Sequence, residues 1–466
     1  MIIPIYSYVN ENFLDKDVFP DTIIVKSEKI FHLERCFLMK TSGKVSFSLV
    51  PLWENPEPVL LNGRLGLLCN QTAWHQETGE YLFETLFRRG NLKRIFIPEH
   101  GLFGELQDQV KLDRTDLYED MGFKDCEFVS LYASRESSLR ADPEKLKDLD
   151  ALVIDLQDVG VRYYTFLSTL KNLFDTLTKG NISLPIWVVD RENPAGPWVE
   201  GTPLQNAYAS FIGIEGVPHR YGLTIGEMAC YFHAETNADF PLNIISYHPE
   251  TNTYAGSRIF PWTVPPSPNI CGFFTADFYS GQCLWEGTNV SEGRGTTRPF
   301  EVFGAPWMEC LTDYNRKSGY ESWNESNHPL SDPGIALRWH RFIPTFHKYK
   351  DECCFGFQLI RRGSGGGFHR NQDGAYHALL HALRLIRFIG ENCDGFSFRP
   401  GKYEAGNDKT AIELLAGDPL ILDYLRGEGP DGRELREYFR KEEKKWIEKT
   451  REYRFYGEPL KSAAAE

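Results

Sequence analysis

Four short apolar runs, each followed by polar residues, constrain the fold of this chain most strongly. They lie at 65–69, 95–97, 151–156 and 185–189 and read LGLLC, IFI, ALVIDL and PIWVV. Runs of this length and composition are typical of strands that are buried on both faces. Helical spacing separates them, notably over 79–89 and 164–178. Strands that alternate with helices predict an α/β domain built on a parallel sheet with helices on both faces.

Ionisable and amide side chains follow these strands at the points where they end. The carboxyl ends of parallel strands meet at one edge of a sheet, and ligands bind outside that edge. We therefore expect a site formed by Asn70, Glu99, His100, Asp155, Gln157, Asp158, Asp190 and Arg191. Loops are polar in any protein, so part of this pattern also has an ordinary structural explanation.

The most informative segment is KRIFIPEHGLFG, Lys93–Gly104. Pro98 ends the apolar run because it has no N–H to donate to a neighbouring strand. Glu99 and His100 follow at once, and Gly101 allows an unusual backbone path. A carboxyl group beside an imidazole at the end of an apolar strand is suited to acid–base chemistry. A simple polar turn is the alternative that this segment alone leaves open.

Two further motifs carry groups that bind anions or sugars. DLQDVGVRYYTF spans 155–166 and EGTNVSEGRGTTRPF spans 286–300, the second on a Gly-rich loop. Arginine presents a planar fork to a carboxylate or phosphate, although each arginine here could instead pair with one of the surplus acids. Together they add six candidate substrate-binding residues: Arg162, Tyr163, Tyr164, Asn289, Arg294 and Arg298.

Length and charge indicate an acidic protein with more than one domain. The 466 residues exceed one ordinary domain. We predict an N-terminal extension over 1–55, a catalytic domain over 56–306 and a smaller α+β domain over 307–466. The formal net charge of −14 argues against nucleic acid as a partner. The ten cysteines include no CxxC pair and are typical of reduced core residues.

The sequence predicts neither a membrane partner nor a cofactor. No apolar stretch is long enough to span a bilayer, and the first residues lack the pattern of a signal peptide. We expect a cytoplasmic protein, while a different start site would leave export open. There is no Walker, GxGxxG or HExxH motif, and we predict no metal. His377 and His381 lie one turn apart on an apolar helix, as core histidines often do.

Taken in order, the motifs resemble those of the DUF1343 family, whose characterised members are exo-β-N-acetylmuramidases of the NamZ type. PEHG-x-x-G matches Pro98–Gly104, and D-x-QD-x-G-x-R-x-YT matches Asp155–Thr165. D-R-x-NP-x-G matches Asp190–Gly196, LTIGE matches Leu223–Glu227, and EGTN-x-S-x-GRGTT-x-PFE matches Glu286–Glu301. Five motifs in the same order are too specific to arise by chance.

The resemblance implies a Rossmann-like domain, a smaller α+β domain and an active site in the cleft between them. It also implies release of a terminal N-acetylmuramic acid from the non-reducing end of peptidoglycan fragments, in peptidoglycan degradation and cell-wall recycling. The substrate would be a muramic-acid-containing glycan, and Glu99 would be the catalytic acid. The segments 105–112 and 132–144 depart from the family pattern near the expected cleft, which leaves the substrate preference open.

Glycoside hydrolysis requires an acid for the leaving oxygen and a second group that meets the charge developing on the sugar. We predict Glu99 as the acid, oriented by His100, and Asp158 as the second group. Asp155, Asp190 and the substrate's own acetamido group are the alternatives to Asp158. The lactyl carboxylate of muramic acid would bind to an arginine, and aromatic rings would pack on the sugar. The candidates are Arg191, Arg294 and Arg298 for the carboxylate, and Tyr163, Tyr164 and Trp262 for the sugar.

Two other functions remain open at this point. One is a non-catalytic protein that binds cell-wall sugars. The other is a nucleotide- or phosphate-using enzyme, which the expected sheet suggests by analogy of fold alone. The sequence leaves the oligomeric state undetermined.

Overall fold

The computed structural model describes residues 44–48, 52, 57–76, 78–245, 264–312, 323, 328, 330–362, 376–404, 407–456 and 460–465. Most of the expected N-terminal extension and Trp262 lie outside these ranges. Within them, no helix is both long enough and apolar enough to cross a membrane.

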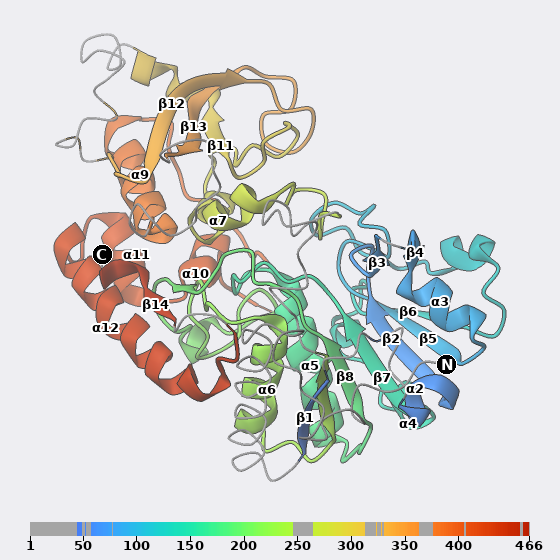
Figure 1. The fold of residues 1–466 in the computed structure, drawn as a ribbon. Helices are drawn as coiled ribbons and strands as arrows, with labels where there is room; N and C mark the ends of the chain where they lie inside the picture. The colour runs from blue at the N-terminus through green and yellow to red at the C-terminus, as the bar shows by residue number, and fades with distance from the viewer. Residues whose placement is uncertain are drawn as a thin grey trace, which may run out of the picture.

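A seven-stranded sheet forms the centre of the first part of the chain (Figure 1). Its strands lie in the order β1-β10-β8-β7-β2-β5-β6, and all neighbours run parallel. They are β1 (Val45–Ser48), β2 (Leu65–Cys69), β5 (Leu92–Ile97), β6 (Glu127–Ser130), β7 (Ala151–Asp155), β8 (Ile186–Val189) and β10 (Leu242–Ile245). Without the edge strand β1, this is the 3-2-1-4-5-6 order of a Rossmann-like sheet. The predicted fold class is confirmed.

The sheet is buried on both faces, which explains its continuous apolar runs. Leu67 pairs with Val153 across β2 and β7, and both side chains pack into one core. The next pair, Leu68 and Ile154, packs into the core on the opposite face, because successive strand residues point to opposite sides. Helices α2 (Pro58–Asn62) and α3 (Leu82–Arg88) cover the first face, and α4 (Glu144–Lys147), α5 (Thr165–Lys179) and α6 (Ile225–Glu235) cover the second.

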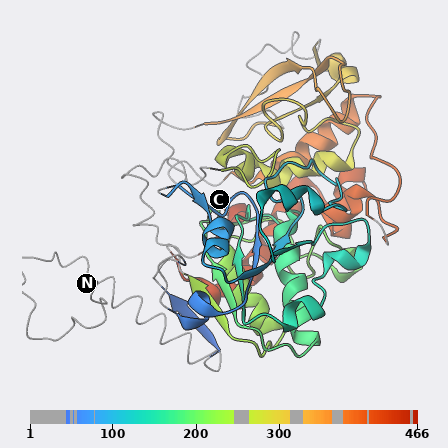
Figure 2. The same cartoon turned by 90° about the vertical axis from the view of Figure 1, so that its right-hand side faces the viewer.

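The second part of the chain, which we count from α7 at Phe273 onward, carries a smaller antiparallel sheet and a group of helices. The residues before it are the first part. Both views place the orange strands of this sheet at the end of the molecule away from the blue and green sheet (Figure 2). The strands are β11 (Val302–Ala305), β13 (Cys354–Arg361) and β12 (Ile335–Phe342), in that order. The helices are α7 (Phe273–Gln282), α9 (Ala378–Asn392), α10 (Ala411–Ala416), α11 (Pro419–Arg426) and α12 (Gly432–Thr450). β11 lies within the predicted catalytic domain, 56–306, but it pairs with β13 of the second part. The predicted domain boundary at 306/307 stays a prediction.

Buried charged groups join the two parts. The carboxylate of Glu200, in the first part, lies 2.8 Å from Nη1 of Arg220. Its other oxygen accepts a hydrogen bond of 3.0 Å from the amide of Leu379, which belongs to α9 of the second part. Glu200 and Arg220 are 0% and 2% exposed. Loss of a hydrogen bond to a buried carboxylate is costly, so the bond from Leu379 holds α9 against the first part.

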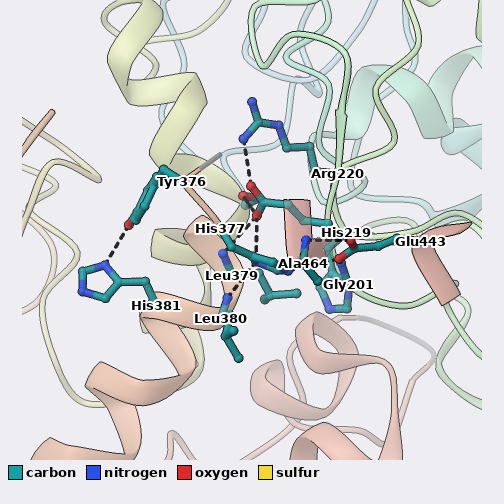
Figure 3. Close-up of polar contacts among 12 residues, drawn as sticks. Gly201, His219, Arg220, Tyr376, His377, Leu379, Leu380, His381, Glu443 and Ala464 are labelled. Atoms are coloured by element: carbon teal, nitrogen blue, oxygen red, sulfur yellow. Dashed lines mark hydrogen bonds and ion pairs between the residues drawn. The ribbon is translucent and has the colours of Figure 1, made fainter. Parts of the chain in front are cut away.

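A second buried carboxylate, that of Glu443 on α12, makes the same kind of connection (Figure 3). It accepts hydrogen bonds from the amides of Gly201 at 2.9 Å and Ala464 at 2.9 Å. Nε2 of His377 lies 3.0 Å from the same carboxylate. His377 and His381 are both buried in this region, in agreement with the expectation of core histidines.

Arg162 completes the junction. We predicted this residue to bind substrate, but the structure buries it fully beside the end of α10. Its guanidinium donates to four backbone carbonyls, those of Thr202 at 2.9 Å, Val217 at 3.2 Å, Leu415 at 3.0 Å and Ala416 at 3.0 Å. Two of these carbonyls belong to each part of the chain, so Arg162 ties the parts together.

We therefore expect Arg162→Met to destabilise the protein by at least about 3 kcal/mol, because it leaves several buried carbonyls without a donor. The free energy of unfolding, measured in urea, tests this expectation. Arg114→Met is the matched control, since Arg114 pairs with Asp116 at the surface and its side chain is 78% exposed. Equal stability of the two variants would contradict the role assigned to Arg162.

Candidate active site

A cavity of about 340 Å³ lies between the two parts of the chain. One wall comes from the loop after β5 and from the turn that begins α5, and the opposite wall comes from the second part. Its polar lining includes Glu99, His100, Asp108, Lys111, Tyr132, Tyr163, Tyr164, Thr165, Glu286, Arg294, Tyr403 and Glu404. Five of the residues predicted from the sequence are among them: Glu99, His100, Tyr163, Tyr164 and Arg294.

Glu99 is held in one orientation at the end of β5. Its Oε2 accepts a hydrogen bond of 2.7 Å from the hydroxyl of Thr165, the first residue of α5. Its Oε1 accepts a hydrogen bond of 3.3 Å from the backbone amide of Gln109. The residue is only 4% exposed, so its carboxyl group is accessible through the cavity alone.

His100 occupies an unusual backbone conformation beside it. Its φ of 77° lies in the left-handed region, which residues other than glycine rarely adopt. Strain of this kind gathers at functional sites, where the surrounding structure enforces it. Nδ1 lies 3.1 Å from the carbonyl oxygen of Leu106 and must donate to it, so Nε2 of a neutral ring is an acceptor. The hydrogen bonds that orient Glu99 come from Thr165 and Gln109 rather than from His100.

Tyr132 and Lys111 form the side of the cavity next to Glu99. The amine of Lys111 lies 3.5 Å from the centroid of the Tyr132 ring, in a cation–π contact. Burial, together with the charge of Glu99, raises the pKa of the Tyr132 hydroxyl. That hydroxyl therefore stays protonated and interacts with the Glu99 carboxylate as a donor.

The opposite wall holds a buried charge cluster around Arg294. Its guanidinium lies 2.7 Å from Glu286, 3.3 Å from Glu292 and 3.6 Å from Asp108. Burial alone would lower the pKa of Arg294, but the three carboxylates outweigh it and raise that pKa. The hydroxyl of Tyr403 donates to Glu286 at 2.6 Å. Arg294 therefore lines the cavity with its positive charge already paired to three carboxylates.

Glu404 contributes a further carboxyl group to this wall. Its Oε1 accepts a hydrogen bond of 3.1 Å from the amide of Ile212. Burial raises the pKa of Glu404, and the negative charge of Glu99 acts in the same direction. The two carboxyl groups, one from each part of the chain, therefore influence each other across the cavity.

Most of the other predicted residues bind one another instead of facing the cavity. Arg191 lies 2.6 Å from Asp155 and also donates to the carbonyl of Thr72 at 2.9 Å. Asp190 accepts from the hydroxyl of Thr224 at 2.8 Å and from the amide of Gly226 at 2.7 Å, at the start of α6. These groups join neighbouring strand ends to each other and to α6.

Asp158, predicted as the second catalytic group, also lies outside the cavity lining. Its Oδ2 accepts from the amide of Gly160 at 2.7 Å and from the hydroxyl of Tyr221. Burial raises its pKa to about 6. Gln157 donates to the carbonyl of Asp158 at 2.7 Å, and Asn70 donates to that of Pro266 at 3.0 Å. This placement gives no support for a direct role in the reaction.

Two residues of the Gly-rich motif are likewise engaged elsewhere. Asn289 donates to the carbonyl of Gly395 at 2.7 Å and accepts from the amide of Ser397 at 3.0 Å. Arg298 pairs with Glu301 at 3.1 Å, and its side chain is 58% exposed. Neither of them lines the cavity.

Sequence reasoning missed several lining residues. Thr165 and Glu286 lie within the motifs at 155–166 and 286–300, so the sequence contained a signal for both. Lys111, Tyr132 and Glu404 carry no recognisable motif, and only the folded chain brings them to Glu99. Among the residues that the structure covers, no cluster of three His, Cys, Asp or Glu side chains is arranged to hold a metal ion.

The buried position of Asp190 predicts a pH-dependent stability. Burial, followed by the charge of Glu227, raises its pKa to about 7, whereas an unfolded aspartate has a pKa of about 3.9. The stabilising contribution of its neutral form is complete below about pH 4 and is lost as the pH rises through 7. Asp190→Asn cannot ionise, so wild type should lose up to about 4 kcal/mol relative to this variant between pH 4 and 8.

Urea unfolding at several pH values measures this difference. Asp120→Asn is the control, because Asp120 is exposed and its variant should follow wild type at every pH. A difference between wild type and Asp190→Asn that does not change with pH would contradict the expectation.

Comparison with known proteins places these features in a family. The family model for the N-terminal part of the exo-β-N-acetylmuramidase NamZ matches residues 65–273, and that for its C-terminal part matches 278–456. The peptidoglycan β-N-acetylmuramidase NamZ of Bacillus subtilis (strain 168) is 32% identical over 322 residues, which are 68% of this chain and 72% of the relative.

Solved structures agree with the fold. Two DUF1343 family proteins of Bacteroides fragilis have TM-scores of 0.63 and 0.59 at 22% and 23% identity. The matches cover 85% and 87% of this chain and 94% and 98% of theirs. At this level of identity they support the architecture alone. With both family models matched in order and a relative aligned over two thirds of its length, the chain belongs to the NamZ exo-β-N-acetylmuramidase (DUF1343) family.

Proposed function

We propose that this protein is an exo-β-N-acetylmuramidase that releases terminal N-acetylmuramic acid from the non-reducing end of peptidoglycan fragments. Its family and the activity named for its Bacillus subtilis relative support the proposal. The observation that carries it is the position of Glu99. The carboxyl group of the PEHG motif lies in a cavity between the two parts and is held by Thr165 and Gln109.

Glu99 is the proposed acid. Protonation of the glycosidic oxygen lets the bond to the anomeric carbon break while the departing sugar leaves as an alcohol. The two hydrogen bonds to Glu99 keep its carboxyl group in one rotamer, so little reorganisation is required when the substrate binds. The buried rings of Tyr163 and Tyr164 line the same cavity and are suited to pack on the sugar.

Glu404 is the proposed second carboxyl group. It lies on the opposite wall from Glu99, whereas Glu286 on that wall is engaged by Arg294 and Tyr403. Although burial raises the resting pKa of Glu404, a positive charge that develops on the sugar favours its ionised form. In its carboxylate form, Glu404 would meet the positive charge that develops on the sugar in the transition state.

Glu99→Gln should lower kcat on a muramic-acid-terminated disaccharide by about 10²- to 10⁴-fold, the usual contribution of a general acid. The decrease in kcat should be much smaller on an aryl muramide, because its acidic phenol can leave without protonation. Release of muramic acid from both substrates measures the effect. Glu119→Gln, at an exposed position, is the control for expression and folding. Undiminished hydrolysis of the disaccharide by Glu99→Gln would refute the assignment.

Glu404→Gln should respond differently to the leaving group. A residue that stabilises the charge on the sugar is required for every substrate, so this variant should lose comparable activity on the disaccharide and on the aryl muramide. The same two assays, run beside Glu99→Gln, give the comparison. If Glu404→Gln spares the aryl substrate and Glu99→Gln does not, the two roles are exchanged.

A further inference from the structure

The cavity is acidic, although the proposed substrate carries a negative charge. Five carboxyl groups line it: Glu99, Asp108, Glu136, Glu286 and Glu404. Muramic acid bears a lactyl carboxylate on the same ring as the anomeric carbon that Glu99 would serve. A cation near Glu99 is therefore required to offset repulsion of the substrate. Among the described lining residues, Lys111 and Arg294 are the Lys and Arg side chains that could act in this way.

Arg294 is poorly suited to this task. Its guanidinium already contacts Glu286, Glu292 and Asp108, and the residue is only 5% exposed. To bind a substrate carboxylate, it would have to leave a carboxylate that is itself buried, and breaking a buried ion pair is strongly unfavourable.

Lys111 has the opposite properties. Its amine makes neither an ion pair nor a hydrogen bond in the described structure, and its one recorded contact is with the face of the Tyr132 ring. It is exposed within the cavity lining, so a ligand can reach it. Desolvation lowers the pKa of Lys111, while the charges of Glu99, Glu404 and Asp108 act against that shift. The amine therefore lies within the electrostatic field of both proposed catalytic groups.

The backbone beneath Lys111 is fixed even though its amine is free. The amide of Leu112 donates to the carbonyl of Tyr132 at 2.9 Å, and the side chain of Leu112 is buried. Asp113 accepts a hydrogen bond of 2.7 Å from the amide of Ser134. The segment 111–113 is thus attached to the segment 132–134, and Lys111 is presented to the cavity from a rigid base.

We propose that Lys111 binds the lactyl carboxylate of the terminal muramic acid and thereby selects muramic acid over sugars that lack this group. This inference rests on the proposed function. It replaces the three arginines expected from the sequence, since Arg191 binds Asp155, Arg294 is paired with buried carboxylates and Arg298 lies outside the cavity lining. Binding at Lys111 places the sugar against Tyr132 and next to Glu99, as removal of a terminal residue requires.

Two muramides that differ only in the lactyl group test the proposal, one with the free carboxylate and one with the carboxamide of similar size. Wild type should prefer the carboxylate by about 10- to 100-fold in kcat/KM, mainly through KM, as expected for one hydrogen bond to a charged group. Lys111→Met should remove this preference, because kcat/KM should fall much more on the carboxylate than on the carboxamide. Lys111→Arg should restore part of the preference.

Lys147→Met is the matched control, because Lys147 pairs with Glu144 at the surface of α4, and it should retain the full preference. A preference that survives in Lys111→Met and in a second variant, Lys111→Gln, overturns the inference. An equal loss on both substrates also overturns it, since Lys111 would then act on Glu99 and not on the lactyl group. If wild type hydrolyses neither muramide, the proposed function itself fails.

Discussion

The geometry of the cavity depends on the hydrogen bonds that the buried carboxylate of Glu443 accepts. This carboxylate is fully buried and accepts hydrogen bonds from Gly201 in the first part and Ala464 near the end of the chain. A buried charge has no alternative partner in water, so this contact tolerates little displacement. It holds α12, which packs against α11, and α11 packs against α10, the helix that follows the segment carrying Tyr403 and Glu404.

The PEHG-x-x-G motif shows how one short segment positions a carboxyl group. Pro98 ends β5, Glu99 enters the cavity, and the left-handed backbone of His100 turns the chain. A Cβ atom at Gly104 would lie 2.1 Å from the side-chain nitrogen of Gln71, in the loop after β2. That nitrogen atom ends a flexible side chain that can move, so the need for glycine comes from the backbone, whose φ of 65° at Gly104 lies in the left-handed region.

Much of the fold follows from the sequence, because strands buried on both faces leave a clear apolar signal. The helical spacing over 164–178 corresponds to α5 (Thr165–Lys179), and the spacing over 79–89 corresponds to α3 (Leu82–Arg88). The capping box of Thr224 and Glu227 likewise marks the start of α6. These are local features, and each is encoded within a few turns of the chain.

The site was harder to predict, for a physical reason. Asp155 and Asp190 lie at strand ends as expected, yet their carboxylates bind Arg191 and Thr224. A polar residue at a strand end has the same sequence signature whether it faces a ligand or joins two loops. Glu404 lies some three hundred positions beyond Glu99 in the sequence, and its approach depends on how the two parts pack. No local pattern contains that information.

The buried contacts of Glu200 and Gly201 have a consequence for synthesis of the protein. Their partners Leu379 and Glu443 are translated long after the first sheet, and β14 (Lys461–Ser462) pairs with β9 (Trp198–Val199) later still. A domain that leaves the ribosome early normally completes its folding while translation continues. Here Glu200 and Arg220 can pair with each other early, but their contacts with Asp277, Ser280 and Leu379 form only after those residues have been made. The enzyme therefore acquires its cavity only after Leu379, Glu443 and β14 have been translated.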